Sequence, residues 1–168
     1  MPLASKSTII LAAASVVYAL DRLSKLLVIE NFGLGQSYAV LDGWFDVTYV
    51  RNLGAAFGFL SFLDGSFRLP FFLVTTLAAI GLLVYFIIKA RPQDVLVLFA
   101  LAIIIGGALG NLTDRLMYGY VVDFIDWHVG GQHWPAFNIA DSGITVGVVL
   151  LGIEIFLRGK PLGEGKAS

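Results

Sequence analysis

LPFFLVTTLAAIGLLVYFII, the stretch from residue 69 to residue 88, carries no charged residue. About twenty apolar residues are needed for one helical crossing of the hydrocarbon core of a membrane. Pro70 suits the first turn of such a helix, where the missing N–H has no partner to lose. A second uncharged stretch, VLVLFALAIIIGGALGNLT, occupies residues 95–113. These two stretches predict a pair of membrane-spanning helices.

Two further apolar stretches lie toward the ends of the chain, at residues 7–29 and 141–157. The first is interrupted in its later part by Asp21, Arg22 and Lys25. We expect both stretches to span the membrane as well. The predicted fold is therefore an all-α polytopic membrane protein with four transmembrane helices, formed as a single domain over residues 1–168.

The start of the chain has a second interpretation. Lys6, an apolar run and several small residues fit a cleaved secretory signal peptide loosely. The apolar pattern resumes after Lys25, however, and this favours a helix that stays in the membrane.

The composition of the chain excludes several classes of protein. Of its 168 residues, 58% are hydrophobic and only 14% are charged, whereas a soluble domain has about 25% charged residues. The formal net charge of −1 gives no reason to expect a nucleic-acid partner. The absence of cysteine removes disulfides, thiolate metal sites and a cysteine nucleophile.

The distribution of basic residues predicts the orientation, because lysine and arginine concentrate on the cytoplasmic side. With four spans, both termini share one side of the membrane. That side carries Lys6, Lys89, Arg91, Arg158, Lys160 and Lys166, and the other carries Arg51, Arg68 and Arg115. We therefore expect cytoplasmic termini, a disordered cytoplasmic tail over residues 159–168, and outward-facing segments at residues 30–68 and 114–140.

The outward segments contain two kinds of pattern. Residues 38–52 alternate partly between apolar and polar side chains, which predicts strands of a small extracytoplasmic β-sheet. The apolar stretch GAAFGFLSFL, residues 54–63, is too short to span and predicts a short interfacial helix or re-entrant piece. The tryptophans lie outside the spans, as in an aromatic belt, at Trp44, Trp127 and Trp134.

Acidic residues gather at the outward ends of the predicted spans. Ionisable groups near membrane depth are costly, so each is a candidate for function. The candidates are Asp21, Asp114, Asp123, Asp126 and Asp141. Two of them follow an asparagine by three residues, in the pairs Asn111–Asp114 and Asn138–Asp141, and residues with this spacing share a helix face.

Each candidate also has a purely structural interpretation. Asp141 could cap the last helix by accepting N–H groups from Gly143 or Ile144. Asp21 and Lys25 are four residues apart, and we favour a neutralising ion pair. Asp114 and Arg115 could serve mainly as a structural anchor, through ion pairs and hydrogen bonds. The remaining acids of the outward segments are expected to be solvated loop charges: Asp42, Asp46, Asp64 and Asp126.

Few catalytic chemistries are compatible with the remaining residues. His128 and His133 are five apart, which is not a metal-site spacing. Ser24 and Lys25 are adjacent, so on a helix they point about 100° apart and make a poor dyad. Carboxylates remain, and two of them sharing a proton can hydrolyse a peptide bond. This reasoning permits an aspartic peptidase without choosing the pair.

Five blocks of sequence resemble the bacterial lipoprotein signal peptidases, or signal peptidase II family, in order and spacing. They are DRLSK (21–25), RNLGAAFGFL (51–60), GGALGNLTDR (106–115), VVDFID (121–126) and FNIADSGITVG (137–147). Each block alone is weak, but five in order make the match specific. The first block departs from the family's usual pattern, because position 22 is Arg rather than Gln, and this leaves the local packing open.

The resemblance implies an aspartic endopeptidase of the inner membrane that cuts prolipoproteins before a diacylglyceryl-modified cysteine. It implies that Asp123 and Asp141 form the catalytic dyad, with its active site facing the periplasm or cell exterior. Supporting or substrate-binding positions would be Asn52, Gly54, Asn111, Asp114, Arg115, Asn138, Asp21 and Lys25. No metal or organic cofactor is expected, and we expect a monomer. Gly54 and Gly58 would let the short outward helix move as a lid.

Two other classes of protein are alternatives to an aspartic peptidase. A small transporter or proton channel also uses aspartates at membrane depth. It would need polar groups through both leaflets, and residues 69–88 and 95–113 offer almost none toward the cytoplasm. A noncatalytic membrane scaffold would explain the small residues of GGALG as helix-packing points. It would not explain aspartates with Asn and Arg partners converging at one interface.

Overall fold

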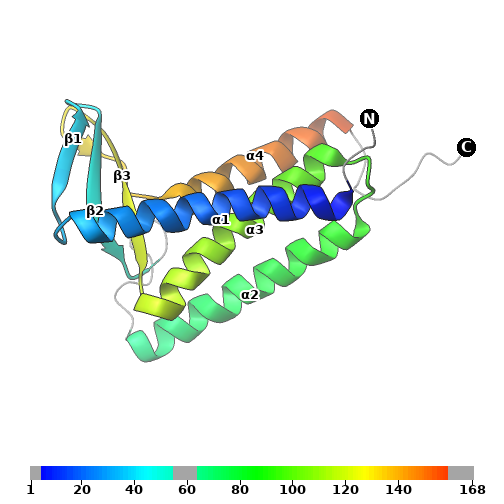
Figure 1. Ribbon diagram of the computed structural model, residues 1–168, viewed down its shortest axis with the longest axis horizontal. Helices are drawn as coiled ribbons and strands as arrows, with labels where there is room; N and C mark the ends of the chain where they lie inside the picture. Colours follow the sequence, from blue (N-terminus) through cyan, green and yellow to red (C-terminus); the bar gives the residue numbers. More distant parts are fainter. Residues whose placement is uncertain (1–4, 55–63, 159–168) are drawn as a thin grey trace, which may run out of the picture.

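A computed structural model describes residues 5–54 and 64–158 of the chain. Its helices are α1 (Lys6–Asn31), α2 (Gly65–Lys89), α3 (Val95–Tyr118) and α4 (Ile139–Arg158), and its strands are β1 (Ser37–Leu41), β2 (Phe45–Asn52), β3 (Val121–Val129) and β4 (Gln132–His133). The helices run along the long axis of the molecule and the sheet lies at one end of them (Figure 1). Successive helices run in alternating directions, so the end of α1, the start of α2, the end of α3 and the start of α4 all lie at the sheet end.

Three helices in the described part are long and apolar enough to cross a membrane: α2, α3 and the part of α4 from Ile139 to Leu157. Helix α1, predicted as a further span, is not among these three. Its outer half contains Asp21, Arg22 and Lys25. The chain is thus a mostly helical membrane protein with a small sheet.

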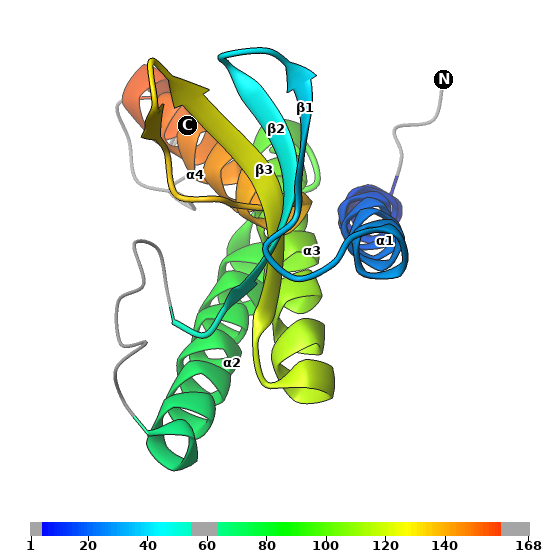
Figure 2. The ribbon, with the colours of Figure 1, turned by 90° about the vertical axis from the view of Figure 1, so that its left-hand side faces the viewer.

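Helix α3 forms the centre of the bundle, and most of its side chains are buried between its neighbours. Small residues permit this close packing. A Cβ added at Gly106 would lie 2.6 Å from the Ala14 carbonyl oxygen of α1, and one at Gly107 would overlap the Ala140 carbonyl of α4. Helix α2 packs less tightly: it lies to one side of α3 (Figure 2), and Phe72 is its one buried residue. Most of its other side chains are exposed, as expected for a helix in contact with lipid, although Leu83 and Ile87 pack against the core cluster that contains Val97 and Leu98.

The sheet is antiparallel in the order β1-β2-β3-β4, in agreement with the strands predicted within residues 38–52. Strand β3 pairs with β2, so that Asp123 lies opposite Val50. The sheet is anchored to the outer end of α1 by a hydrophobic cluster that includes Val28, Val122 and Phe124. This contact fixes the position of β3 relative to the helices.

Three acids predicted to be solvated loop charges make specific contacts in the structure. Asp64 is the N-cap of α2, and its side chain accepts the Ser66 backbone N–H at 2.8 Å. Asp46 lies in β2 and contacts His128 at 3.1 Å, while Asp126 lies directly opposite it in β3. Asp126 in turn contacts His133 of β4 at 3.0 Å. The prediction was wrong for Asp46 and Asp126, because their contacts join segments that strand pairing brings together, whereas Asp64 is exposed as predicted.

Some predicted features lie outside the described residues. Of the stretch GAAFGFLSFL, only Gly54 is described, so the short outward helix and its lid role stay predictions. The same holds for the tail at residues 159–168. Helix α3 extends beyond its predicted end at residue 113 and stops at Gly119, whose φ of 77° is left-handed. Asp114 and Arg115 therefore belong to the last turns of α3 rather than to a loop.

Candidate active site

A buried lysine lies beneath the site and joins α1 to α3. Lys25 is 0% exposed, and its ammonium group lies 2.8 Å from Asp21 and 2.9 Å from Asp114. Its third contact is the Asn111 side-chain oxygen at 2.9 Å. The three N–H donors of the ammonium group thus have three acceptors. The predicted Asp21–Lys25 ion pair is confirmed, and Lys25 also neutralises Asp114.

The two buried aspartates beside Lys25 also hold the backbone around the site. Asp21 accepts the Ala140 backbone N–H at 2.9 Å, which fixes the first turn of α4. Asp114 accepts the Val122 backbone N–H at 3.1 Å, one residue before Asp123. Through these bonds, Asp21 and Asp114 fix the two segments that carry Asp123 and Asp141.

Arg22, the departure from the family pattern, packs without conflict. Its guanidinium pairs with Asp114 and lies 5.9 Å from the ring centroid of Tyr118. Asp114 is therefore held by two cations, from positions 22 and 25 of α1. The structural role considered for Asp114, an ion-pair anchor, is confirmed, with Arg22 and Lys25 as its partners.

Asp123 is buried and held by two amides. Asn52 Nδ2 donates to one carboxylate oxygen at 2.9 Å, and Asn138 Nδ2 donates to the other at 2.7 Å. Burial raises the pKa of Asp123 to about 7, and the charge of nearby Asp141 acts in the same direction. The amide bonds oppose this shift without cancelling it. Below about pH 7, Asp123 is therefore protonated, which is unusual for an aspartate.

Asp141 faces the same space from the first turn of α4. Asn111 Nδ2 donates to its Oδ1 at 2.8 Å. The capping role considered for Asp141 belongs to Asn138, whose side-chain oxygen accepts the Asp141 backbone N–H at 2.9 Å. Asn138 thus caps α4 and holds Asp123 with the same side chain. The Asp141 carboxylate is left to face the cavity.

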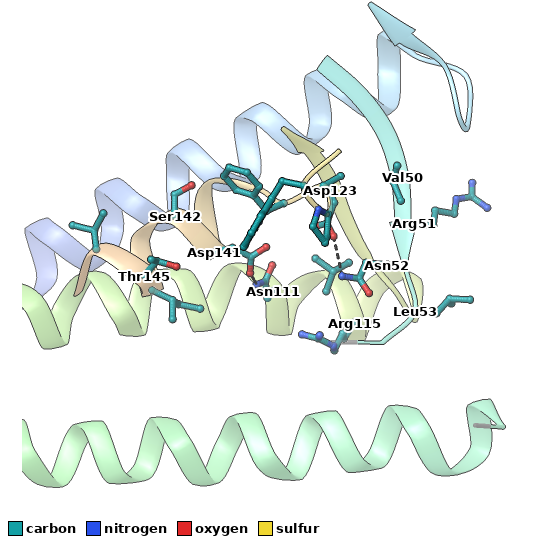
Figure 3. A pocket seen from close by; sticks show the side chains of 17 residues that line it. Val50, Arg51, Asn52, Leu53, Asn111, Arg115, Asp123, Asp141, Ser142 and Thr145 are labelled. Atoms are coloured by element: carbon teal, nitrogen blue, oxygen red, sulfur yellow. Dashed lines mark hydrogen bonds between the residues drawn. The ribbon is translucent and has the colours of Figure 1, made fainter. Parts of the chain in front are cut away.

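Asp123 and Asp141 line one cavity of about 1120 Å³ between the sheet and the helices (Figure 3). Asn52, Asn111 and Arg115 also line it. The remaining wall is largely apolar and includes Trp134, Phe137, Ile144 and Val146. An apolar cavity with a few convergent polar groups is the usual form of a binding site. The carboxylates would meet a ligand in a partly water-excluded environment.

Arg115 contributes a cationic group to the cavity, which Arg51 also lines. Its Nη2 donates to the Gly54 carbonyl oxygen at 3.2 Å, and its guanidinium lies 4.6 Å from the Phe72 ring centroid. Within residues 5–54 and 64–158, Arg115 forms no ion pair. Of its five N–H donors, one is used by an acceptor within the described ranges, the Gly54 carbonyl oxygen. Figure 3 places its side chain on the side of the cavity that faces α2.

The arrangement suits acid–base chemistry with two carboxylates. Buried carboxylates that influence each other's ionisation can divide the roles of acid and base. Across the described ranges, no three side chains of His, Cys, Asp or Glu are grouped so as to hold a metal ion.

A family model described as signal peptidase (SPase) II matches residues 13–157. The chain belongs to the signal peptidase II family. A lipoprotein signal peptidase of Syntrophus aciditrophicus (strain SB) is 45% identical over 150 residues, which cover 89% of this chain and 93% of that protein. One of Geobacter sulfurreducens (strain ATCC 51573 / DSM 12127 / PCA) is 48% identical over 136 residues, covering 81% of this chain and 84% of that protein.

Solved structures agree with membership of the signal peptidase II family. One, described as a bacterial membrane enzyme, has a TM-score of 0.81 and 34% identity, and the match covers 95% of this chain and 94% of that one. Another with the same description has a TM-score of 0.78 and 35% identity, with 87% and 91% covered. As a signal peptidase II family member, the chain is a membrane-bound protease.

Of the five acidic candidates, Asp123 and Asp141 line this cavity, Asp21 and Asp114 lie beneath it, and Asp126 contacts His133 outside it. The sequence analysis missed Ser142, Thr145 and the segment Trp134–Phe137, which also line it. Ser142 and Thr145 follow Asp141 by one and four residues, and an i, i+4 spacing from a catalytic candidate could have indicated Thr145. No local pattern indicates the segment before Asn138, because the pairing of Phe137 with Ile125 places it.

Proposed function

We propose that this family member removes the signal peptide from diacylglyceryl-modified prolipoproteins, with Asp123 and Asp141 as its catalytic pair. The observation that carries this proposal is the placement of two carboxylates, buried Asp123 and half-buried Asp141, in one apolar-walled cavity between the sheet and the helices. A signal peptide in the membrane would present its cleavage site at that end, while the diacylglyceryl group stays among the lipids.

The pair would hydrolyse the peptide bond directly. One carboxylate takes a proton from water while the water oxygen attacks the scissile carbonyl carbon, and the other carboxyl gives its proton to the carbonyl oxygen. The tetrahedral intermediate then collapses, the C–N bond breaks, and the leaving nitrogen receives a proton. The raised pKa of Asp123 suits a shared proton at neutral pH. The proton belongs to the pair rather than to one fixed residue.

The neighbouring residues divide into those that hold the pair and those that face substrate. Asn52 and Asn138 orient Asp123, and Asn111 orients Asp141. Arg115 and the Gly54 backbone lie where the substrate peptide would pass. The buried group beneath, made of Asp21, Lys25 and Asp114, keeps the two segments in place.

The diacylglyceryl group should decide which peptides are cut. We expect the purified protein, in detergent or lipid, to cleave a prolipoprotein peptide just before its lipidated cysteine. Buried acyl methylenes contribute to binding, so kcat/KM for the unlipidated peptide should be at least about tenfold lower. Mass spectrometry of the products identifies the cleaved bond. No cleavage of either peptide would refute the proposal and favour a transporter or scaffold.

We further propose that all four helices, α1 included, cross the inner membrane in a single monomeric domain with cytoplasmic termini. Lys6 supports this, because its ammonium group donates to the Ala90 carbonyl oxygen at 2.9 Å and so lies at the same end as Lys89 and Arg91. The site would then face the periplasm or cell exterior.

The chain has no cysteine, so single cysteines can report this orientation. In intact spheroplasts, a membrane-impermeant maleimide should label Asp42→Cys, at the β1–β2 turn, and should label Ser5→Cys only after lysis. The reverse pattern would invert the proposed orientation, and equal labelling of both would place α1 outside the bilayer.

A further inference from the structure

Phe72 differs from the other residues of α2 in its burial and in its contact with Arg115. It is the one buried residue of α2, at 9% exposure, whereas the other side chains of the helix are exposed or half-buried. The guanidinium of Arg115 lies over its ring, 4.6 Å from the ring centroid. A cation over an aromatic face at this distance is attracted by the ring quadrupole, and more strongly where water is excluded.

Arg115 has only neutral partners in the described part of the chain. These are the Phe72 ring and the Gly54 carbonyl oxygen. Three carboxylates act on its charge: Asp114 of α3, Asp123 of β3 and Asp141 of α4. Asp114 is already neutralised by Arg22 and Lys25. The catalytic pair is therefore the group toward which an unrestrained Arg115 would move.

The contact with Phe72 continues to the catalytic pair through an unbroken series of bonds. Arg115 donates to the Gly54 carbonyl, the Gly54 N–H donates to Asn52 Oδ1 at 2.9 Å, and Asn52 Nδ2 donates to Asp123. Helix α2 is thus connected to Asp123 through the Phe72 ring, Arg115, the Gly54 backbone and the Asn52 side chain.

We propose that Phe72 is a positioning residue, whose ring holds Arg115 at the edge of the cavity, free for substrate and apart from the catalytic carboxylates. This inference rests on the proposed function. It assigns to α2 a part in the site that is not visible in the sequence of the helix, where residues 69–88 carry no charge. Without the ring, Arg115 would collapse onto Asp123 and Asp141. Its charge would then stabilise the doubly ionised pair, which is inactive.

The kinetic test compares Phe72→Leu, which removes the ring face, with Phe72→Tyr, which keeps it. We expect kcat/KM on the lipidated peptide to fall about 5- to 20-fold for Phe72→Leu, from the size of a desolvated cation–π contact. Phe72→Tyr should stay within about twofold of wild type. Phe86→Leu, the same change near the far end of α2, is the matched control and should leave activity unchanged.

The pH profile separates positioning from packing. With one shared proton required, wild-type activity should fall as the pH rises through about 7, the pKa of Asp123. A cation close to a carboxylate lowers its pKa by about one unit or more, so this fall should move to lower pH by about that amount in Phe72→Leu. Phe72→Tyr should keep the wild-type profile. Equal kcat/KM and equal profiles for the two Phe72 variants would overturn the proposal.

A thermal double-mutant cycle tests the contact without relying on activity. The Tm values of Phe72→Leu, Arg115→Gln and the double variant are measured in detergent. If Phe72 acts through Arg115, the double variant should lose less Tm than the sum of the two single variants. Additive losses would overturn the proposal whether or not the protein cleaves lipidated peptide. Failure of the wild-type protein to cleave would refute only the proposed function.

Discussion

Asp123→Asn and Asp141→Asn should each reduce cleavage of the lipidated peptide by about a thousandfold or more, because each removes one partner of a proton transfer. Asparagine has nearly the shape of aspartate and keeps one accepting oxygen, so the amide contacts to Asn52, Asn138 or Asn111 are partly preserved. The loss should therefore appear in kcat, with substrate affinity little changed. Single-turnover cleavage and equilibrium binding of the lipidated peptide separate the two quantities.

Asp126→Asn provides the matched control for these variants. Asp126 lies in the same strand as Asp123 but contacts His133 outside the cavity. Its replacement should leave kcat/KM within about threefold of wild type, since isolated surface contacts contribute little. All three variants should elute as folded protein. If either Asp123→Asn or Asp141→Asn retained a tenth of wild-type activity, the assignment of the catalytic pair would be wrong.

Lys25→Met should be the most damaging single change to stability. Lys25 is fully buried between Asp21 and Asp114, and methionine would leave their charges short of a partner in a low dielectric. Breaking a buried ion pair by removing one partner costs about 3–5 kcal/mol. For a chain of this length, that loss lowers Tm by about 10 °C. Thermal unfolding in detergent measures it directly.

A second variant distinguishes lost charge balance from lost packing. Neutralising Asp21 as well, in Lys25→Met with Asp21→Asn, should recover part of the lost Tm, because Asp114 still pairs with Arg22 and no buried carboxylate is left without a cation. Lys89→Met, at the exposed end of α2 farthest from the sheet, should change Tm by less than about 2 °C. A Tm of Lys25→Met equal to that of Lys89→Met would contradict the role assigned to Lys25.

The parts of the structure that could be predicted from the sequence depend on local patterns. Lipid requires a long apolar run for each crossing, so α2 and α3 were recognisable from composition alone. The Asp21–Lys25 pair was predictable because residues four apart meet on a helix. The strands within residues 38–52 were predictable from partial alternation. In each case a short window of sequence contains both partners.

The missed contacts join residues that are distant in the chain. Asp114 pairs with Arg22, 92 residues away, and its neighbour Arg115 instead reaches Phe72 of α2 and the backbone at Gly54. Asp46 and Asp126 appeared to be isolated loop charges until pairing of β2 with β3 placed them opposite each other. Helix crossing and strand register decide such contacts, and neither can be read from the spacing of residues.

The double role of Asn138 has a consequence for the order in which the site is assembled during synthesis. Its side chain caps α4 and also holds Asp123, and Asp141 lies in the turn that it caps. Translation proceeds from the N-terminus, so a nascent chain that has emerged only through α3 and the sheet lacks one acid and the amide that orients the other. Insertion of the last helix is therefore the event that completes the proposed catalytic pair.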